Sequence, residues 1–288
     1  MTDSDIVRSL NPSVLTLLIM KNKMLANYRI FAKSLLAMFL LCSIADVQAE
    51  PEAKKGTVLI TGANRGLGLA LSKQFAADNY HVIGTARSPE KATELKKVAN
   101  EVLALDVTSD ESIKALAKTL NGKTIDILVN NAGYFGPTLG LGTERDKSAT
   151  LKTLTRSEVL DCFAVNSAGP IFVTQGLIPN LLASKQPKII IISSRSGIIN
   201  QSRSAGAYGY RISKTAVNRA VKIMSVDKAL GNSIVVAIAP GHNQTDMGGD
   251  RAKLTPDQSM KMVKTLIEGL TKKHDGGFWY YDGKKLPW

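Results

Sequence analysis

Cysteine is nearly absent from this chain of 288 residues, which contains only Cys42 and Cys162, neither of them in a CxxC pair. A disulfide framework or a zinc site would need more thiols at closer spacing. The three histidines add no recognisable metal-ligand spacing, so no metal site is predicted. Because cysteine is a small apolar side chain, core filling is the predicted role of Cys162.

Acidic residues are also scarce: 24 Asp and Glu stand against 37 Lys and Arg, for a formal net charge of +13. No arginine-rich block or zinc-finger spacing accompanies this surplus, which argues against a nucleic-acid partner. Two interpretations remain, a solvated basic surface and the attraction of phosphates, anionic substrates or a membrane surface. The hydrophobic fraction of 44% is typical of a globular protein.

No apolar run reaches the ~20 residues that a membrane-spanning helix needs. The longest, at 34–45, follows a basic stretch that begins at Met24 and precedes small residues up to Ala49. This pattern predicts a secretory signal peptide that starts at Met24 and is cut after Ala49. The alternatives are a membrane anchor and an unstructured or loosely helical extension. The chain therefore divides into an N-terminal extension, 1–50, and a main domain, 51–288.

From residue 57 onward, short apolar runs alternate with helical patterns. The apolar runs predict strands at 57–61, 81–86, 102–106, 127–130, 188–193, 233–239 and 278–281. The helical patterns predict helices at 68–77, 89–98, 109–120, 157–183, 207–230 and 255–270. Several strands are apolar throughout, as in a parallel sheet that is covered on both faces. The alternation predicts one doubly wound, Rossmann-type α/β domain, with a parallel sheet of about seven strands flanked by helices and ligands at the strands' carboxyl ends.

The first predicted strand runs into the glycine-rich segment TGANRGLG at 61–68. Glycines permit a tight turn and a close approach of the backbone, and the following helix offers free N–H groups and the positive end of its dipole. The segment therefore predicts a site for the pyrophosphate of a dinucleotide, with a plain structural turn as the alternative. The predicted contacts are Gly62, Asn64, Arg65, Gly66, Leu67 and Gly68.

The second predicted strand lacks a terminal acid and ends GTAR at 84–87. An acid there would bond the ribose diol of NAD and repel the 2′-phosphate of NADP. Arg65 and Arg87 instead carry guanidinium groups, which suit phosphate, so the predicted cofactor is NADP(H). Two solvated arginines are the alternative. Asp106 and Val107, after the third strand, are predicted beside the adenine ring, although Asp106 is equally compatible with a simple strand end.

The glycine-rich segment, NNAG at 130–133 and YRISK at 210–214 together make the chain resemble the short-chain dehydrogenase/reductase family. Residues 240–249, PGHNQTDMGG, and the C-terminal end are similar to the branch that holds C-signal protein and small NADPH carbonyl reductases. His242 departs from that branch, where tryptophan is common. The resemblance implies further cofactor contacts at Asn131, Ala132, Gly133, Tyr210, Lys214, Pro240, Gly241 and Thr245.

The resemblance also implies a catalytic set of Asn166, Ser194, Tyr210 and Lys214. A free tyrosine has a pKa of about 10, too high for efficient proton transfer at neutral pH. Tyr210 and Lys214 stand four residues apart and share a helix face, where an ammonium group lowers the pKa of a phenol. The family pattern gives Ser194 the role of polarising the substrate carbonyl, and gives Asn166 that of positioning Lys214 through a water.

The sequence therefore predicts an NADP(H)-dependent oxidoreductase that moves hydride between nicotinamide and a small carbonyl or alcohol substrate. The alternative is a signalling or nucleotide-sensing protein that uses the same fold with little turnover. The family resemblance implies a homodimer or homotetramer. Cofactor chemistry favours the cytoplasm, whereas the N-terminal segment favours export or association with a membrane, and no twin-arginine pair precedes its apolar run.

Overall fold

The computed structural model describes residues 11–42, 53–136, 150–201 and 205–288, and it divides the chain after residue 52 into two compact units. The first unit contains helix α2 (Pro12–Cys42), which continues through Met24 without a break. No helix within the described residues is both long and apolar enough to cross a membrane. The cleavage site predicted after Ala49 lies outside the described residues, so the signal peptide stays a prediction.

The second unit is built on a seven-stranded parallel sheet with the order β3-β2-β1-β4-β5-β6-β7. The strands are β1 (Thr57–Ile60), β2 (His81–Ala86), β3 (Glu101–Ala104), β4 (Ile127–Asn130), β5 (Lys188–Ile192), β6 (Ile234–Ala239) and β7 (Phe278–Tyr280). The strand order reverses between β1 and β4, where a doubly wound sheet opens its ligand crevice. The predicted Rossmann-type fold is confirmed.

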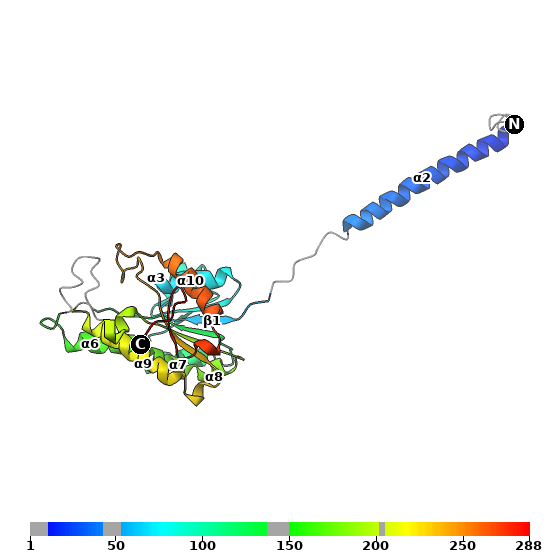
Figure 1. Ribbon diagram of the computed structural model, residues 1–288. Helices are drawn as coiled ribbons and strands as arrows, with labels where there is room; N and C mark the ends of the chain where they lie inside the picture. Colours follow the sequence, from blue (N-terminus) through cyan, green and yellow to red (C-terminus); the bar gives the residue numbers. More distant parts are fainter. Residues whose placement is uncertain (1–10, 43–52, 137–149, 202–204) are drawn as a thin grey trace. The chain divides into compact units, whose positions relative to one another are not determined.

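Helices cover both faces of this sheet (Figure 1). They are α3 (Gly66–Ala77), α5 (Asp110–Thr119), α6 (Arg156–Phe163), α7 (Gly169–Gly176), α8 (Ile178–Leu182), α9 (Tyr208–Met224) and α10 (Pro256–Glu268). Strand β5 shows how the layers form, because its side chains alternate between the two faces. Ile189 and Ile191 pack with residues of α5, α7 and α9, whereas Ile190 and Ile192 pack with residues of α3 and α10.

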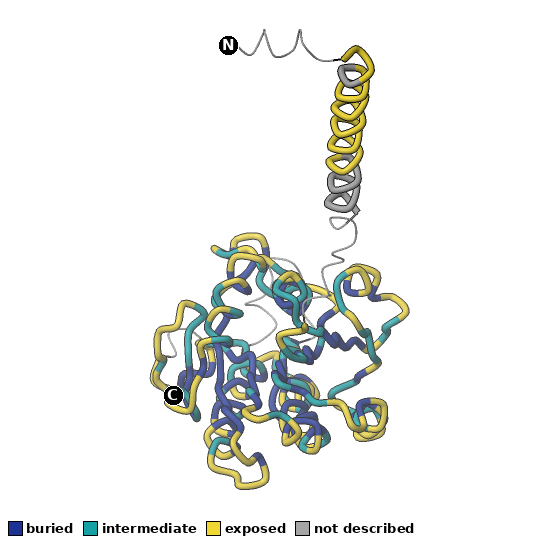
Figure 2. Tube along the Cα trace, turned by 90° about the vertical axis from the view of Figure 1, so that its right-hand side faces the viewer, coloured by how far each residue is buried: buried dark blue, intermediate teal, exposed yellow. Residues whose placement is uncertain are grey.

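The buried residues lie in the interior of this unit, and the exposed residues lie on its outer loops and helices (Figure 2). Most strand residues are apolar because both faces of the sheet are covered, and the ionisable exceptions, His81, Glu101 and Lys188, stand at the first position of their strands. Each fully buried isoleucine contributes about 1.5–3 kcal/mol to the hydrophobic stabilisation of the sheet.

The prediction of a single helix at 89–98 is wrong. The segment forms a 3-10 turn, η1 (Pro89–Lys91), and a one-turn helix, α4 (Thr93–Lys96), separated by the non-helical residue Ala92. Tertiary packing explains the break. Leu95 lies directly on β2, so close that a Cβ at Gly84 would stand 2.8 Å from the Leu95 side chain.

The predicted helix at 157–183 is continuous from α6 through the π-helical turn η2 (Ala164–Ala168) into α7, and it is interrupted at Leu177 before the short helix α8. At the start of α7, Gly169 lies against Val107, where a Cβ would approach the valine side chain to 3.0 Å. The predicted helix at 207–230 is too long, because α9 ends at Met224. The last residues form a separate 3-10 turn, η5 (Lys228–Leu230), capped by Asp227.

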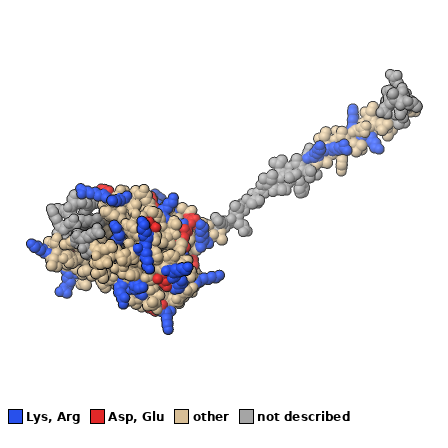
Figure 3. All heavy atoms as spheres, in the orientation of Figure 1, with Lys and Arg blue, Asp and Glu red and all other residues tan. Residues whose placement is uncertain are grey.

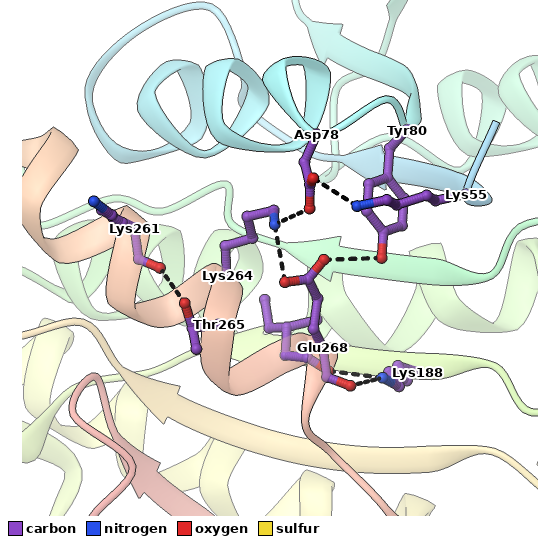
Figure 4. Close-up of polar contacts among 9 residues, drawn as sticks. Lys55, Asp78, Tyr80, Lys188, Lys261, Lys264, Thr265 and Glu268 are labelled. Carbon is purple, nitrogen blue, oxygen red and sulfur yellow. Dashed lines mark hydrogen bonds and ion pairs between the residues drawn. The ribbon is translucent and has the colours of Figure 1, made fainter. Parts of the chain in front are cut away.

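A polar cluster lies where β1, β2 and β5 begin and where α3 and α10 end (Figure 4). We call it the closed network; it comprises Lys55, Asp78, Tyr80, Lys188, Lys264 and Glu268. Lys264 is an ion-pair partner of both Asp78 and Glu268, the latter at 2.9 Å, and Lys55 pairs with Asp78 at 2.6 Å. Tyr80 donates to Glu268 at 3.1 Å. Lys188 donates to the carbonyl oxygens of Ile267 and Glu268, at the end of α10, at 2.8 and 2.7 Å.

Candidate active site

A cleft of about 1290 Å³ opens beyond the carboxyl ends of the strands. Its walls include every predicted site residue except Gly68 and Asn166, which are packed behind them. The volume exceeds the ~300–1,000 Å³ that is typical of sites for single drug-sized ligands. The fold therefore brings the predicted cofactor and catalytic residues to one cavity that is large enough for two ligands side by side.

The glycine-rich turn between β1 and α3 requires its glycines for two physical reasons. Gly62 and Gly66 have φ values of +62° and +54°, in the left-handed region that favours glycine. Gly68 packs so tightly that a Cβ would lie 2.4 Å from the carbonyl oxygen of Gly62. The turn thus brings bare backbone and the N-terminus of α3 to the surface of the cleft.

Asn131 and Thr61 join the NNAG segment to this turn. The Asn131 amide donates to the carbonyl oxygens of Thr61 and Gly62, at 2.9 and 3.1 Å. The Thr61 hydroxyl accepts from the backbone N–H groups of Asn131 and Ala132, each at 3.0 Å. The sequence analysis missed Thr61, because its partners lie about seventy residues away.

One end of the cleft is lined by cations. The predicted residue Arg87 lies there together with Lys73 of α3 and Lys91 of η1, which the sequence analysis missed. Among the described residues, none of these three cations lies in an ion pair.

Asp106 lies after β3 and also lines the cleft. It accepts a hydrogen bond from the Thr108 side chain at 2.7 Å, and this bond, with a smaller contribution from Arg87, lowers the pKa of Asp106 despite partial burial. The Asp106 carboxylate is thus held charged beside the cleft.

The segment 240–249 forms the opposite wall of the cleft. Gly241 has a φ of +82°, and a Cβ there would lie 2.8 Å from the Tyr281 ring. Thr245 accepts a hydrogen bond at its hydroxyl from the Gly248 N–H at 3.0 Å. The Thr245 methyl carbon lies 3.5 Å from the position of a Cβ on Gly66, so the two walls approach each other here.

Tyr210 and Lys214 lie in the first turns of α9, and both line the cleft. The residue before the helix, Ala207, has a strained left-handed φ of +51°. Lys214 is 5% exposed, and its Nζ donates to the Ile192 carbonyl oxygen at 2.8 Å and lies 5.8 Å from the centre of the Tyr210 ring. Burial lowers the pKa of Lys214 to about 8. The Phe135 ring packs on Tyr210, with 4.8 Å between ring centres.

The two neighbouring serines after β5 make different contacts. Ser193 donates its hydroxyl to the Asn218 side chain at 2.6 Å, in the core. Ser194 caps the 3-10 turn η3 (Arg195–Gly197), where its hydroxyl oxygen accepts from the Ser196 N–H at 3.0 Å. A Cβ at Gly197 would stand 2.8 Å from the Lys214 backbone, so only glycine lets the serine turn approach α9 this closely.

Asn166 lies in the π-helical turn η2 and is 1% exposed. Its side-chain oxygen accepts from the Tyr134 N–H at 2.8 Å, and its amide donates to the Tyr134 carbonyl oxygen at 2.7 Å and to the Ser213 hydroxyl at 3.0 Å. Ser213 in turn donates to the Tyr210 carbonyl oxygen at 2.7 Å. Asn166 thus ties the NNAG segment to the first turn of α9. Its predicted water-mediated effect on Lys214 stays a prediction.

Cys162 is fully buried, and burial raises the pKa of its thiol to about 11, which suits its predicted role as core filler rather than a nucleophile. Within the described residues, no group of three or more His, Cys, Asp or Glu side chains is arranged to hold a metal ion.

The doubly wound sheet places the glycine turn at its reversal point, and Ser194, Tyr210 and Lys214 line the same cleft. Residues 56–255 match the sequence model of the short chain dehydrogenase family. The chain belongs to this family of oxidoreductases, which act on small molecules. It is 33% identical to C-signal of Myxococcus xanthus over 176 residues, 61% of this chain and 100% of that protein. It is 30% identical to an oxidoreductase of Schizosaccharomyces pombe, over 79% of this chain and 96% of the relative.

Solved structures give the same assignment. The carbonyl reductase Sniffer of Drosophila melanogaster is 31% identical, with a TM-score of 0.70 over 81% of this chain and 99% of that one. An NADPH-bound carbonyl reductase from chicken fatty liver is 29% identical, with a TM-score of 0.72 over 82% of this chain and 100% of that one. A short-chain dehydrogenase/reductase of Burkholderia multivorans with bound NADP is 29% identical, with a TM-score of 0.70 over 81% of this chain and 99% of that one.

Proposed function

We propose that this protein is an NADP(H)-dependent reductase of carbonyl compounds, or the alcohol dehydrogenase that runs the same reaction in reverse. The observation that carries the proposal is that Ser194, Tyr210 and Lys214 line the same cleft as the glycine turn. The two structural relatives with NADPH or NADP bound support the choice of cofactor.

The residues of the cleft fit this cofactor. A Cβ at Gly62 would stand 3.0 Å from the backbone of Ala132, so glycine lets the turn pack against the NNAG segment while its bare backbone lines the cleft where a pyrophosphate would bind. Arg65 and Arg87 line the cleft, and β2 ends without an acid that would repel a 2′-phosphate. Thr245 and the NNAG segment would hold the nicotinamide end. When bound, the cofactor supplies hydride to the carbonyl carbon, or accepts it from the alcohol.

Tyr210 would supply the matching proton to the carbonyl oxygen, which becomes the alcohol hydroxyl as hydride adds to the carbon. Lys214, with a pKa of about 8, carries its charge at neutral pH and favours the ionised form of the neighbouring phenol. Ser194 would donate a hydrogen bond to the same carbonyl oxygen and so polarise it. Asn166 would act indirectly, by holding the turn that carries Tyr210.

The test is a screen of aldehydes and ketones with NADPH and with NADH, for the wild type, Tyr210→Phe and Tyr208→Phe. Tyr208 is the matched control, because it lies on the same helix but does not line the cleft. We expect activity with NADPH that falls by about 10²–10⁴-fold in Tyr210→Phe only. Undiminished turnover in Tyr210→Phe would exclude the mechanism. A wild type that binds NADPH but reduces nothing would favour the signalling alternative.

We also propose that the N-terminal helix holds the enzyme at the cytoplasmic face of a membrane. Helix α2 exposes large apolar side chains from Leu17 to Phe31 and has no acidic residue over its whole length. Four cations accompany them, at Lys21, Lys23, Arg29 and Lys33. Exposed apolar groups with uniformly positive charge favour an anionic lipid surface.

Sedimentation with phosphatidylglycerol vesicles tests this location. The full chain should pellet with them, and the chain with all four cations changed to glutamine should remain in solution. Equal pelleting of both chains would exclude an electrostatic anchor.

The family likeness supports a homodimer or homotetramer. Light scattering of the purified protein during size-exclusion chromatography would distinguish the two.

A further inference from the structure

An ion pair bridges the two walls of the cleft. Arg65, in the glycine turn, and Asp246, in the segment 240–249, join through Nη1 and Oδ2 at 2.8 Å. Both side chains line the cleft, and both are about two-thirds exposed, at 67% and 66%. The contact spans 181 residues of sequence. It forms where Thr245 lies close to Gly66, at the approach of the two walls.

The turn that carries Asp246 is tightly built. The Thr245 carbonyl and hydroxyl oxygens accept from the N–H groups of Gly249 and Gly248, at 2.7 and 3.0 Å. A Cβ on Gly248 would lie 1.6 Å from the carbonyl oxygen of Asn243, so only glycine fits this turn. Asp246 is therefore presented from a compact turn, and Arg65 is the longer and more adjustable partner of the pair.

The pair changes the charge of the cleft. Arg65 lines the cleft paired with a carboxylate, whereas Lys73, Arg87 and Lys91, which also line it, have no ion pair within the described part of the chain. A phosphate group that takes a hydrogen bond from Arg65 would meet the Asp246 carboxylate at short range, and like charges repel. The carboxylate and such a phosphate therefore compete for one guanidinium group.

We propose that Asp246 competes with the cofactor's 2′-phosphate for Arg65 and thereby limits the preference of the site for NADP(H) over NAD(H). The inference rests on the proposed function, which gives Arg65 a phosphate to bind. When the phosphate binds, Arg65 turns from the carboxylate to the phosphate, and the bridge between the two walls opens. NADH has no 2′-phosphate, so it leaves the pair closed. Asp246 is thus a specificity residue on the wall opposite the glycine turn.

The experiment measures the dissociation constants of NADPH and NADH, by cofactor fluorescence, for the wild type, Asp246→Asn and Asp250→Asn. Asp250 is the matched control: it lies in the same region and is exposed, but it does not line the cleft. Asp246→Asn should bind NADPH roughly two- to fivefold more tightly, the range of an exposed ion pair. Its affinity for NADH should stay within about twofold, as should both affinities of Asp250→Asn. In an Arg65→Gln background the effect of Asp246→Asn should vanish.

Two results would overturn the inference. If Asp246→Asn weakens the binding of NADPH and of NADH by the same factor, the ion pair helps to retain either cofactor. If it changes neither dissociation constant, Arg65 does not exchange partners. Both differ from failure of the proposed function, in which the wild type binds neither cofactor or reduces no carbonyl compound. The gain in Asp246→Asn should also shrink at high salt, because exposed charges are screened.

Discussion

The two ends of the sheet hold lysines in opposite electrostatic environments. At the amino end, Lys264 has a side chain that is 12% exposed and touches the carboxylates of Asp78 and Glu268. Burial opposes its charge, but the bonds to the two acids outweigh burial and raise the pKa of Lys264. At the carboxyl end, Lys214 is more deeply buried, at 5% exposed, and its one hydrogen bond among the described residues goes to a carbonyl oxygen, so burial lowers its pKa to about 8.

This contrast shows what separates a structural lysine from a reactive one. The two lysines differ in burial and in partner, because Lys214 is buried whereas Lys264 is only partly so. Two carboxylates stabilise the charged form of Lys264, whereas the charge of Lys214 beside Tyr210 is imperfectly compensated. Groups with such shifted pKa values gather at sites that move protons. Matched substitutions at the two lysines test the distinction.

The largest expected effect is on catalysis. Lys214→Met should lower kcat/KM for carbonyl reduction with NADPH by about 10²–10⁴-fold, because Tyr210 loses the ammonium that favours its ionised form. Lys264→Met, with the same change of side chain, should stay within about twofold of the wild type. Steady-state rates of both variants check this. Similar losses in the two would remove the functional contrast between the ends of the sheet.

Stability should respond in the opposite order. Lys264→Met leaves the partly exposed carboxylates of Asp78 and Glu268 without their shared partner, so the free energy of unfolding should fall by about 0.5–1 kcal/mol. Lys261→Met is the control, because Lys261 is exposed on the same helix and its side chain lies outside the closed network (Figure 4). Urea denaturation gives both values. A loss in Lys261→Met as large as in Lys264→Met would mean that the network adds nothing specific.

Lys214→Met should stabilise the fold at neutral pH. The pKa shift from 10.5 to about 8 corresponds to roughly 3 kcal/mol of destabilisation, and the lost bond to Ile192 costs about 1 kcal/mol. We therefore expect a net gain of about 2 kcal/mol by urea denaturation. An unchanged or lower stability would show that the buried ammonium is well compensated.

The smallest effects are the pH dependences, which should fall in opposite windows. Hydrogen bonds from Lys264 and then Lys55 hold the pKa of Asp78 well below its usual value, so its contribution to stability is fully present above about pH 4 and is lost progressively as the pH falls below that value. The destabilisation by Lys214 is full below pH 8 and fades as pH rises toward 10. Urea midpoints at pH 3, 5, 7 and 9 should therefore fall less in acid for Lys264→Met. The advantage of Lys214→Met should shrink at pH 9.

The surface charge distribution shows how far the bulk composition misleads. Lysines and arginines are scattered over the visible face of the second unit (Figure 3), in line with a solvated basic surface. The cations that line the cleft are a small set, and a net charge of +13 does not reveal them. Lys73 and Lys91 carry no motif, and only the folding of α3 and η1 beside β2 brings them to the cleft.

The sequence alone determined the features that depend on local spacing. The alternation of apolar runs and helical patterns was sufficient to predict the doubly wound sheet, because the periodicities of strands and helices span only a few neighbouring residues. The glycine-rich segment and the four-residue step from Tyr210 to Lys214 were visible for the same reason. The helix at 89–98 could not be predicted correctly, because the packing of Leu95 against Gly84 overrides helix propensity there.

Only the tertiary structure decided which charges are paired. The glycine-rich segment around Arg65 predicts a contact with phosphate, yet Arg65 forms an ion pair with Asp246, 181 residues further along the chain. The family pattern selects Ser194 over its neighbour Ser193, and the tertiary structure adds that Ser193 donates its hydroxyl to Asn218 in the core. Lys214 and Lys264 are the same residue type, and they differ in burial and in charged partners. Desolvation and charge pairing act through space over a few ångströms, so they depend on contacts that no local pattern of residues encodes.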